Sequence, residues 1–247
     1  MILSPGDSHH PLVDAGSPVM RSLLQLLPTI AAHDAPVVLL GESGVGKTTI
    51  ARAIHQASPR RGRRLAVIDC LALAADPPKA PAALTRRLKE AAGGALLLEE
   101  VATLPDRAQL ALATFLEDER RASNGSSGPR IIATSSRDLD AEVLAGHVRR
   151  QLFTRIGVVE IRVPPLRERR EDVLLLASQL AEAFARREGR PAPEFTLRAR
   201  QALLNYPWPG NIPELRNAVQ RAMILADSPV VDVDALPPRV SGTSPEH

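Results

Sequence analysis

The stretch Gly41-Glu42-Ser43-Gly44-Val45-Gly46-Lys47-Thr48 matches the pattern G-x-x-x-x-G-K-[ST] at every fixed position. It lies between an apolar run, Pro36–Leu40, and a segment with helical spacing, 48–57, which is the context that this pattern requires. In such a loop, backbone N–H groups surround a phosphate, the lysine reaches the β- and γ-phosphates, and the following hydroxyl can ligate Mg²⁺. The sequence therefore predicts a site for ATP or ADP with Mg²⁺, in which Thr48 also binds the metal and the nucleotide is held by Gly41, Glu42, Ser43, Gly44, Val45, Gly46, Lys47, Thr48 and Thr49.

The apolar runs outside this loop indicate the fold. Like Pro36–Leu40, four further runs are apolar on both faces, as expected of strands buried in a parallel sheet: Leu65–Ile68, Ala95–Leu98, Ile131–Ala133 and Val158–Ile161. Helical patterns separate them, over 48–57, 82–92 and 105–119, and another helix is expected to begin at Ser17-Pro18. We therefore expect a three-layer α/β domain with a mainly parallel sheet over residues 17–165.

After Val163-Pro164-Pro165 the strand patterns stop and helical ones follow, over 171–187, 197–206 and 212–226. They predict a small all-α domain over residues 166–236, with Asn211 as the N-cap of its last helix. Residues 1–16 are expected to be a flexible leader and residues 237–247 a disordered tail. Loops are expected at 76–81 and 123–129.

Composition excludes several classes of protein. The 247 residues have a net charge of +3, with 28 arginines but only three lysines, and six aromatic residues, so neither a dense basic patch nor a stacking platform for nucleic acid is indicated. A single cysteine, Cys70, excludes an internal disulfide, and no Cys/His cluster has zinc spacing. No apolar run approaches the roughly 18 residues of a membrane span, and the N-terminus does not resemble a signal peptide. We therefore expect a cytoplasmic protein without a membrane segment.

Two carboxylates follow the run Ala95–Leu98. Glu99 is placed to hold Mg²⁺, and Glu100 is placed to polarise an attacking water. The alternative is that both are solvated carboxylates at the end of a strand. The preceding phosphate-loop pattern favours the catalytic interpretation.

These residues, in this order, resemble the AAA+ ATPase domain of the NtrC-type bacterial enhancer-binding proteins, which activate sigma-54 RNA polymerase. The resemblance extends from about Gly16 to Ala226 and is most specific in Gly41–Lys47, Arg130–Leu139, Val163–Val173 and Tyr206–Asn217. It implies a P-loop fold with a helical lid and an oligomeric ring, often a hexamer, with nucleotide held between subunits. Arg149 and Arg155 then match the arginine fingers that reach a neighbour's γ-phosphate, although either could be a solvated surface arginine.

The sequence also departs from the family pattern. Members that drive sigma-54 carry a Gly-Ala-Phe-Thr-Gly-Ala loop before the strand that ends in the acidic pair, whereas Leu71–Ala92 contains no such hexapeptide and no Phe. Direct remodelling of sigma-54 is therefore not expected, although the transcription machinery stays a candidate partner, since relatives such as TyrR-like regulators act on ordinary promoters. No helix-turn-helix pattern is present in Asp227–His247, so autonomous DNA binding is not expected.

Four catalytic positions differ as well. Glu99 stands where the family has Asp, Ser136 replaces the sensor I Asn, Pro213 replaces the sensor II Arg, and Asp69 replaces the Asn that restrains the catalytic Glu. Arg216 could substitute for the lost sensor II contact. One lost contact at such a site costs about 2.7–4 kcal/mol of transition-state stabilisation. Two hypotheses follow: a weakly hydrolysing homo-oligomeric regulator, or a non-hydrolysing adaptor that donates its arginines to another AAA+ protein in a mixed ring.

Overall fold

The structure is a computed structural model that describes residues 15–121, 128–191, 193–226 and 230–242. The chain divides into two compact units. The sheet unit comprises residues 25–42 and 47–163, and the helical unit comprises the described parts of 1–24, 43–46 and 164–247. The expected domain limits, 17–165 and 166–236, stay a prediction.

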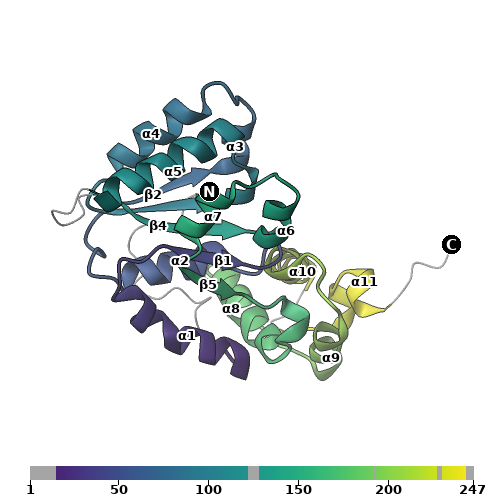
Figure 1. Ribbon diagram of the computed structural model, residues 1–247. Helices are drawn as coiled ribbons and strands as arrows, with labels where there is room; N and C mark the ends of the chain where they lie inside the picture. Colours follow the sequence, from purple (N-terminus) through teal and green to yellow (C-terminus); the bar gives the residue numbers. More distant parts are fainter. Residues whose placement is uncertain (1–14, 122–127, 192, 227–229, 243–247) are drawn as a thin grey trace. The chain divides into compact units, whose positions relative to one another are not determined.

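The sheet unit is built on a five-stranded parallel sheet with the order β2-β3-β4-β1-β5 (Figure 1). The strands β1, β3 and β4 are buried along nearly their whole length, which accounts for the continuous apolar runs in the sequence. In register, Val37 of β1 pairs with Ile132 of β4 and with Val159 of β5. The predicted parallel sheet is confirmed, with the strands β1 Val37–Leu40, β2 Leu65–Asp69, β3 Ala95–Glu99, β4 Arg130–Ser135 and β5 Val159–Arg162.

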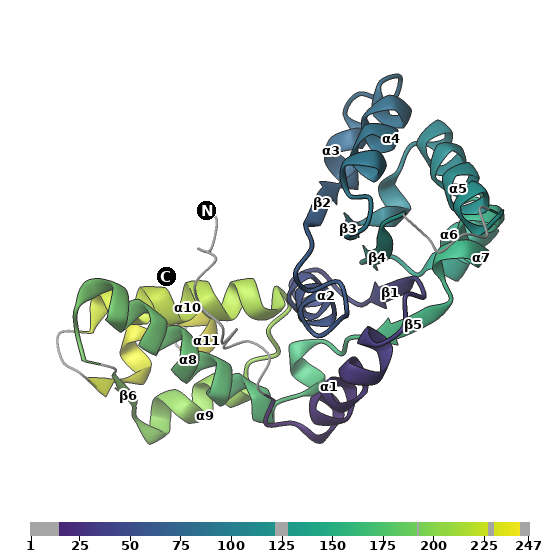
Figure 2. The ribbon, with the colours of Figure 1, turned by 90° about the vertical axis from the view of Figure 1, so that its left-hand side faces the viewer.

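Helices cover both faces of this sheet. Figure 2 shows α5 and α7 on one side of the strands and α2 on the other, so the sheet unit has the three layers that the sequence predicts. The helices α3, α6 and α7 were not expected, because five to seven residues are too few to establish a helical period. The helices are α1 Pro18–Ala31, α2 Lys47–Gln56, α3 Cys70–Ala74, α4 Ala80–Glu90, α5 Asp106–Arg121, α6 Leu139–Leu144 and α7 Arg150–Ile156, with 3₁₀ turns at Val101–Thr103 and Leu166–Glu168.

The helical unit has its own apolar core. Trp208 is fully buried in it, donates its indole N–H to Leu203 O at 2.9 Å, and meets the Tyr206 ring edge to face with centroids 4.9 Å apart. A buried indole needs such a partner for its N–H. The elements of the helical unit are α8 Glu171–Glu188, β6 Glu194–Phe195, α9 Leu197–Asn205, α10 Asn211–Leu225, β7 Val230–Val231, the 3₁₀ turn Val233–Ala235 and α11 Pro238–Ser241.

Several expectations for this unit are wrong in detail. It is not entirely helical, because β6 and β7 form a short parallel pair. The expected disordered tail contains α11, in which Val240 is buried in the core, whereas residues 243–247 lie outside the described part. The N-cap of α10 is Gly210, and Asn211 is the first helical residue.

The expected limits of two other segments also differ from the structure. Gly16, expected in the flexible leader, donates its N–H to Asp172 Oδ1 at 2.6 Å, and residues 1–14 lie outside the described part. The helix α4 begins at Ala80, inside the expected loop 76–81. Most of the expected loop 123–129 is likewise outside the described residues. Within the described part of the chain, no helix is long and apolar enough to cross a membrane.

Candidate functional site

The glycine-rich loop joins β1, which ends at Leu40, to α2, which begins at Lys47. This confirms the expected order of strand, loop and helix. Gly41, Gly44 and Gly46 have φ values of 149°, 78° and 104°. Side-chain-bearing residues rarely adopt such angles, so the three glycines provide the backbone shape of the loop.

Lys47 is buried at the start of α2, and its ammonium group donates hydrogen bonds to residues of the sheet unit. Nζ donates to Gly41 O at 2.7 Å, to Glu42 O at 3.0 Å and to Ser136 Oγ at 3.1 Å. Burial lowers the pKa of Lys47, and the nearby Glu100 carboxylate opposes that effect. The lysine is thus held close to the loop backbone, as a phosphate-binding lysine must be.

Glu100 follows β3 in a left-handed conformation with φ of 54°. Its N–H donates to Thr134 Oγ1 at 3.1 Å, and its carboxylate accepts from Ser136 N at 2.7 Å and from Ser136 Oγ at 2.6 Å. Lys47 Nζ lies 3.4 Å from Glu100 Oε1. Three residues that the sequence placed in one site, Lys47, Glu100 and Ser136, therefore come together.

Thr48 and Glu99 offer the oxygen atoms for a metal. Thr48 Oγ1 donates to Glu99 Oε1 at 2.6 Å. A hydroxyl and one carboxylate fit Mg²⁺, which binds proteins through one or two carboxylates and keeps waters and substrate phosphates as its other ligands. Among the described residues, no group of three or more His, Cys, Asp or Glu could hold a metal by itself, so the protein alone would be an incomplete site.

Asp69 does not form a hydrogen bond to Glu100 in the described part of the chain. Its carboxylate caps α3 by accepting from Leu71 N at 2.9 Å and Ala72 N at 3.3 Å. A carboxylate is well suited to an N-cap, which explains why Asp serves this helix end. Burial, followed by the charges of Asp69, Glu100 and Glu99, raises the pKa of the Cys70 thiol, so that this cysteine stays protonated.

The two candidate arginine fingers lie at the start and end of α7, where each bonds to an acidic residue of α5. Arg149 Nη2 is 2.5 Å from Asp106 Oδ2, and Arg155 pairs with Glu117. These hydrogen bonds hold the pKa values of both carboxyl groups below their ordinary range. Among the described residues, neither arginine contacts Lys47 or Glu100 by a hydrogen bond or ion pair.

Sequence reasoning missed Gln109, a buried residue of α5. Its Oε1 accepts from Arg149 N at 2.8 Å, while its Nε2 donates to Leu104 O and His147 O. The side chain therefore fixes the backbone from which Arg149 extends. Nothing in the local pattern of α5 distinguishes this glutamine from a surface residue.

The sensor II region lies in the helical unit. A Cβ added at Gly44 would come 2.7 Å from Pro213 Cδ, so the proline ring packs directly on the loop. Arg216 is exposed on α10, and its side chain makes no hydrogen bond or ion pair with any residue that the structure describes. Its substitution for the lost sensor II contact stays a prediction.

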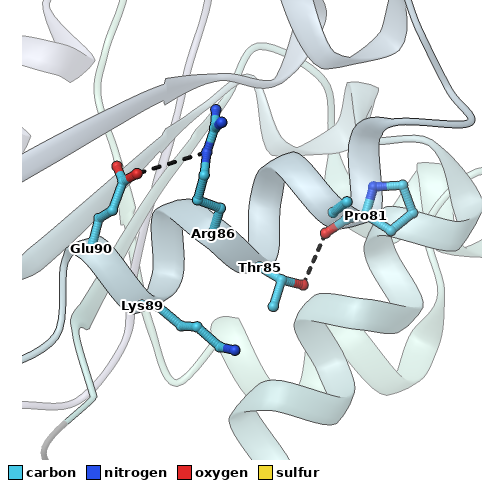
Figure 3. A pocket seen from close by; sticks show the side chains of 6 residues that line it. Pro81, Thr85, Arg86, Lys89 and Glu90 are labelled. Atoms are coloured by element: carbon cyan, nitrogen blue, oxygen red, sulfur yellow. Dashed lines mark hydrogen bonds and ion pairs between the residues drawn. The ribbon is translucent and has the colours of Figure 1, made fainter.

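A separate depression of about 600 Å³ lies along α4. Figure 3 shows that its walls come from this one helix, with Thr85 bonded to Pro81 O and Arg86 paired with Glu90. It shares no residue with the candidate nucleotide site. Its lining residues are Pro81, Ala82, Thr85, Arg86, Lys89 and Glu90.

The parallel sheet, the glycine-rich loop after β1 and the two carboxylates at the end of β3 define a P-loop fold of the AAA+ class. A family model described as the sigma-54 interaction domain matches residues 13–162, and one described as the AAA+ ATPase lid domain matches residues 167–247. The chain belongs to the sigma-54 interaction domain family, which confirms the resemblance found in the sequence.

Individual relatives agree. The alginate biosynthesis transcriptional regulatory protein AlgB of Pseudomonas aeruginosa is 38% identical over 242 residues, covering 91% of this chain and 54% of AlgB. The transcriptional regulatory protein ZraR of Klebsiella oxytoca is 37% identical, covering 92% of this chain and 55% of ZraR. The crystal structure of NtrX from Brucella abortus in complex with ATP is similar to this chain, with a TM-score of 0.80 and 31% identity, and the match covers 92% of this chain and 56% of NtrX. The crystal structure of NtrX in complex with ADP matches with a TM-score of 0.79 and covers 92% of this chain and 55% of NtrX. The chain spans about half the length of the curated relatives it matches.

Proposed function

We propose that this chain binds ATP or ADP with Mg²⁺ through the loop Gly41–Thr48, hydrolyses ATP slowly, and serves as a cytoplasmic transcription-regulatory module. The observation that carries the proposal is the cluster of Lys47, Glu100 and Ser136, with Lys47 Nζ 3.4 Å from Glu100 Oε1 and 3.1 Å from Ser136 Oγ. The ATP and ADP complexes of NtrX support a nucleotide as the ligand. The description of AlgB and ZraR as transcriptional regulatory proteins supports a role in transcription regulation.

Each residue has a defined task in this proposal. Lys47 neutralises phosphate charge, and Glu100 accepts a proton from the attacking water, while Ser136 bonds both Glu100 oxygens and restrains this base. Thr48 and Glu99 hold Mg²⁺, which when bound neutralises the charge that develops on the phosphates. Thr49 extends the binding loop into the first turn of α2, where the helix N-terminus favours an anion.

Slow turnover follows from the substitutions at the site. Glu99 is longer than Asp and already bonds to Thr48, and Pro213 has no group that could reach a phosphate. Arg216 follows Ile212 by one helical turn on α10, and the Ile212 Cδ1 atom lies 3.5 Å from a Cβ placed at Gly46. We therefore propose Arg216 as the replacement cation for sensor II.

Steady-state phosphate release from the wild type, Lys47→Ala and Glu100→Gln tests the proposed activity. We expect ADP binding in the wild type and in Glu100→Gln, none in Lys47→Ala, and hydrolysis in the wild type alone. Equal background rates in all three, with ADP still bound by the wild type, would instead support the non-hydrolysing adaptor. A wild type that binds no nucleotide would contradict both.

We further propose a homo-oligomeric ring in which Arg149 and Arg155 complete the site of a neighbouring subunit. Lys47→Ala loses its own phosphate contact, whereas Arg149→Ala loses only the contribution to a neighbour. An equimolar mixture of these two variants is therefore expected to regain hydrolysis, and the specific activity of the wild type to rise with protein concentration. Flat specific activity and a silent mixture would refute the shared site.

Direct remodelling of sigma-54 is not part of the proposed function. The segment between β2 and β3 consists of α3 and α4 and carries no Gly-Ala-Phe-Thr-Gly-Ala sequence. Open-complex formation by sigma-54 holoenzyme is accordingly expected to be unchanged on adding this chain with ATP. ATP-dependent stimulation would show that another segment makes the contact.

A further inference from the structure

Three successive loop residues, Ser43, Gly44 and Val45, belong to the helical unit. The carbonyl oxygen of each accepts a hydrogen bond from another residue of that unit. Asn211 Nδ2 donates to Ser43 O at 3.0 Å, Ile212 N donates to Gly44 O at 3.2 Å, and Arg169 Nη2 donates to Val45 O at 2.6 Å. We refer to the two side chains that donate, Arg169 and Asn211, as the carbonyl clamp.

Both members of the clamp are themselves held in place. Asn211 is fully buried, and its Oδ1 accepts from Leu166 N at 2.8 Å. Arg169 is 4% exposed, and its Nη1 lies 4.0 Å from Asp172 Oδ2. Asp172 in turn accepts from Ser17 N at 2.7 Å. The donors that reach the loop are therefore fixed by packing and hydrogen bonds on their far sides.

The buried guanidinium of Arg169 is costly. Burial lowers its pKa, against the opposing effect of Asp172, and its Nε has no hydrogen-bond partner in the described part of the chain. Asn211 also has a left-handed backbone with φ of 51°, at a further cost. An apolar residue at position 169 would avoid the cost of burying a guanidinium, and positive φ is less costly for Asn than for an apolar residue, so packing alone does not account for Arg169.

The geometry of the peptide group gives the clamp a consequence for binding. Because the peptide is planar and trans, the C=O of one residue and the N–H of the next point in opposite directions. Holding the carbonyls of Ser43, Gly44 and Val45 on one side therefore turns the N–H groups of Gly44, Val45 and Gly46 to the other. Successive N–H groups on one side of a loop form an anion-binding concavity.

The close packing of Pro213 supports the same arrangement. A Cβ at Gly44 would lie 2.7 Å from Pro213 Cδ and 3.1 Å from Gly210 O, so the loop packs closely against Pro213 at this glycine. Resting on the proposed nucleotide binding, we propose that Arg169 and Asn211 are positioning residues that preorganise the Ser43–Gly46 backbone for the phosphates of a nucleoside di- or triphosphate.

Isosteric substitutions test this. Asn211→Asp keeps the shape, the tolerance of positive φ and the acceptor for Leu166 N, but removes the donor to Ser43 O. Arg169→Met keeps most of the apolar stem and removes the donor to Val45 O. The matched controls are Asn217→Asp, exposed on the same helix, and Arg170→Met, the exposed neighbour of Arg169.

ADP binding is measured by titration calorimetry on the full chain, with thermal unfolding of the nucleotide-free proteins. We expect each clamp variant to weaken ADP binding about tenfold or more, which corresponds to about 1.4 kcal/mol or more, and the controls to stay within a factor of two. Arg169→Lys, which retains a cation and donors, should restore part of the affinity. The double variant should bind ADP less weakly than the product of the single effects predicts, because both act on one loop.

The outcomes separate this inference from the proposed function. Clamp variants that unfold at the wild-type temperature and bind ADP as the wild type does would overturn the inference alone. If Asn211→Asp does not fold, Arg169→Met and its Lys rescue decide in the same way. Absence of ADP binding by the wild type would overturn the proposed function and this inference with it.

Discussion

Ser136 holds the Glu100 carboxylate at both oxygens, with its N–H 2.7 Å from Oε2 and its hydroxyl 2.6 Å from Oε1. The Lys47 ammonium lies 3.4 Å from the same Oε1. A general base needs an available lone pair directed at the water. In this arrangement Ser136 and Lys47 engage Oε1 and the Ser136 N–H engages one lone pair of Oε2, so the candidate base is restrained.

Removal of the Ser136 hydroxyl is therefore expected to activate hydrolysis. Ser136→Ala loses the hydrogen bond to Oε1 but keeps the backbone N–H that orients Oε2. Hydrogen bonds to charged groups contribute about 1.5–3 kcal/mol, and recovering part of the smaller figure would raise kcat about threefold to tenfold. The measurement is steady-state phosphate release at saturating ATP.

Ser136→Thr is the control, because it keeps the hydroxyl and should keep the wild-type rate. A fall in kcat for Ser136→Ala, with Ser136→Thr unchanged, would mean that the hydroxyl orients Glu100 productively and does not restrain it.

A second prediction concerns the bond between Thr48 Oγ1 and Glu99 Oε1, which is 2.6 Å long. Glu99→Asp shortens the carboxylate by one methylene and withdraws it from Thr48, leaving room for the water ligands that Mg²⁺ retains. We expect a lower Mg²⁺ concentration for half-maximal hydrolysis and a higher kcat, measured by Mg²⁺ titration of ATP turnover. Glu90→Asp, on the exposed face of α4, should change neither, and a higher Mg²⁺ requirement in Glu99→Asp would contradict the assignment.

The strand–loop–helix core of this site could be predicted from the sequence, because it depends on local patterns. An apolar run indicates a central strand, and the pattern G-x-x-x-x-G-K-[ST] identifies the loop. The acidic pair at the end of β3 is predicted for the same reason. Each of these signals is contained within about ten residues of chain.

The contacts that the sequence does not reveal join residues that are far apart along the chain. Asn211 is 168 residues from Ser43, and Arg169 is 124 residues from Val45, so no local period reveals either contact. The sequence predicts Asn211 as an N-cap because Asn favours that position. In the structure its side chain instead forms hydrogen bonds with Ser43 O and Leu166 N, and Gly210 is the N-cap. The short helix α7 was overlooked as well, although both candidate arginine fingers belong to its ends.

The pairing of Arg149 with Asp106 leads to a third prediction. Within one chain the guanidinium bonds to the Asp106 carboxylate at 2.5 Å, and in the proposed ring this contact must break before Arg149 can reach a neighbour's nucleotide. Asp106→Ala frees the guanidinium, so half-maximal specific activity should occur at a severalfold lower protein concentration. The measurement is ATP turnover across protein concentration.

Asp118→Ala removes the same charge from an exposed position on α5 and should leave that concentration unchanged. Equal behaviour of the two variants would show that the Asp106 contact does not compete with assembly.

The last prediction is a pH dependence of stability at Asp34. Arg60 donates to both carboxylate oxygens, from Nε at 3.0 Å and from Nη2 at 2.8 Å, and these hydrogen bonds hold the pKa of Asp34 below its ordinary value. Arg60 also donates to Gly94 O at 2.9 Å and Gly128 O at 2.7 Å, so its geometry is fixed. A lowered folded-state pKa means that the unfolded chain binds the proton more tightly.

The stabilisation is therefore complete above the unfolded pKa of about 3.9 and is lost as the pH falls through the lower folded value. Because the Asp34 side chain is 57% exposed, solvent screening limits the contribution to about 0.2–1 kcal/mol. In urea unfolding, Asp34→Asn should be less stable than the wild type at pH 7, and the difference should shrink progressively below about pH 4. Asp118→Asn should show no such convergence, and a constant difference between Asp34→Asn and the wild type from pH 7 to pH 3 would show that the pair does not contribute through its charge.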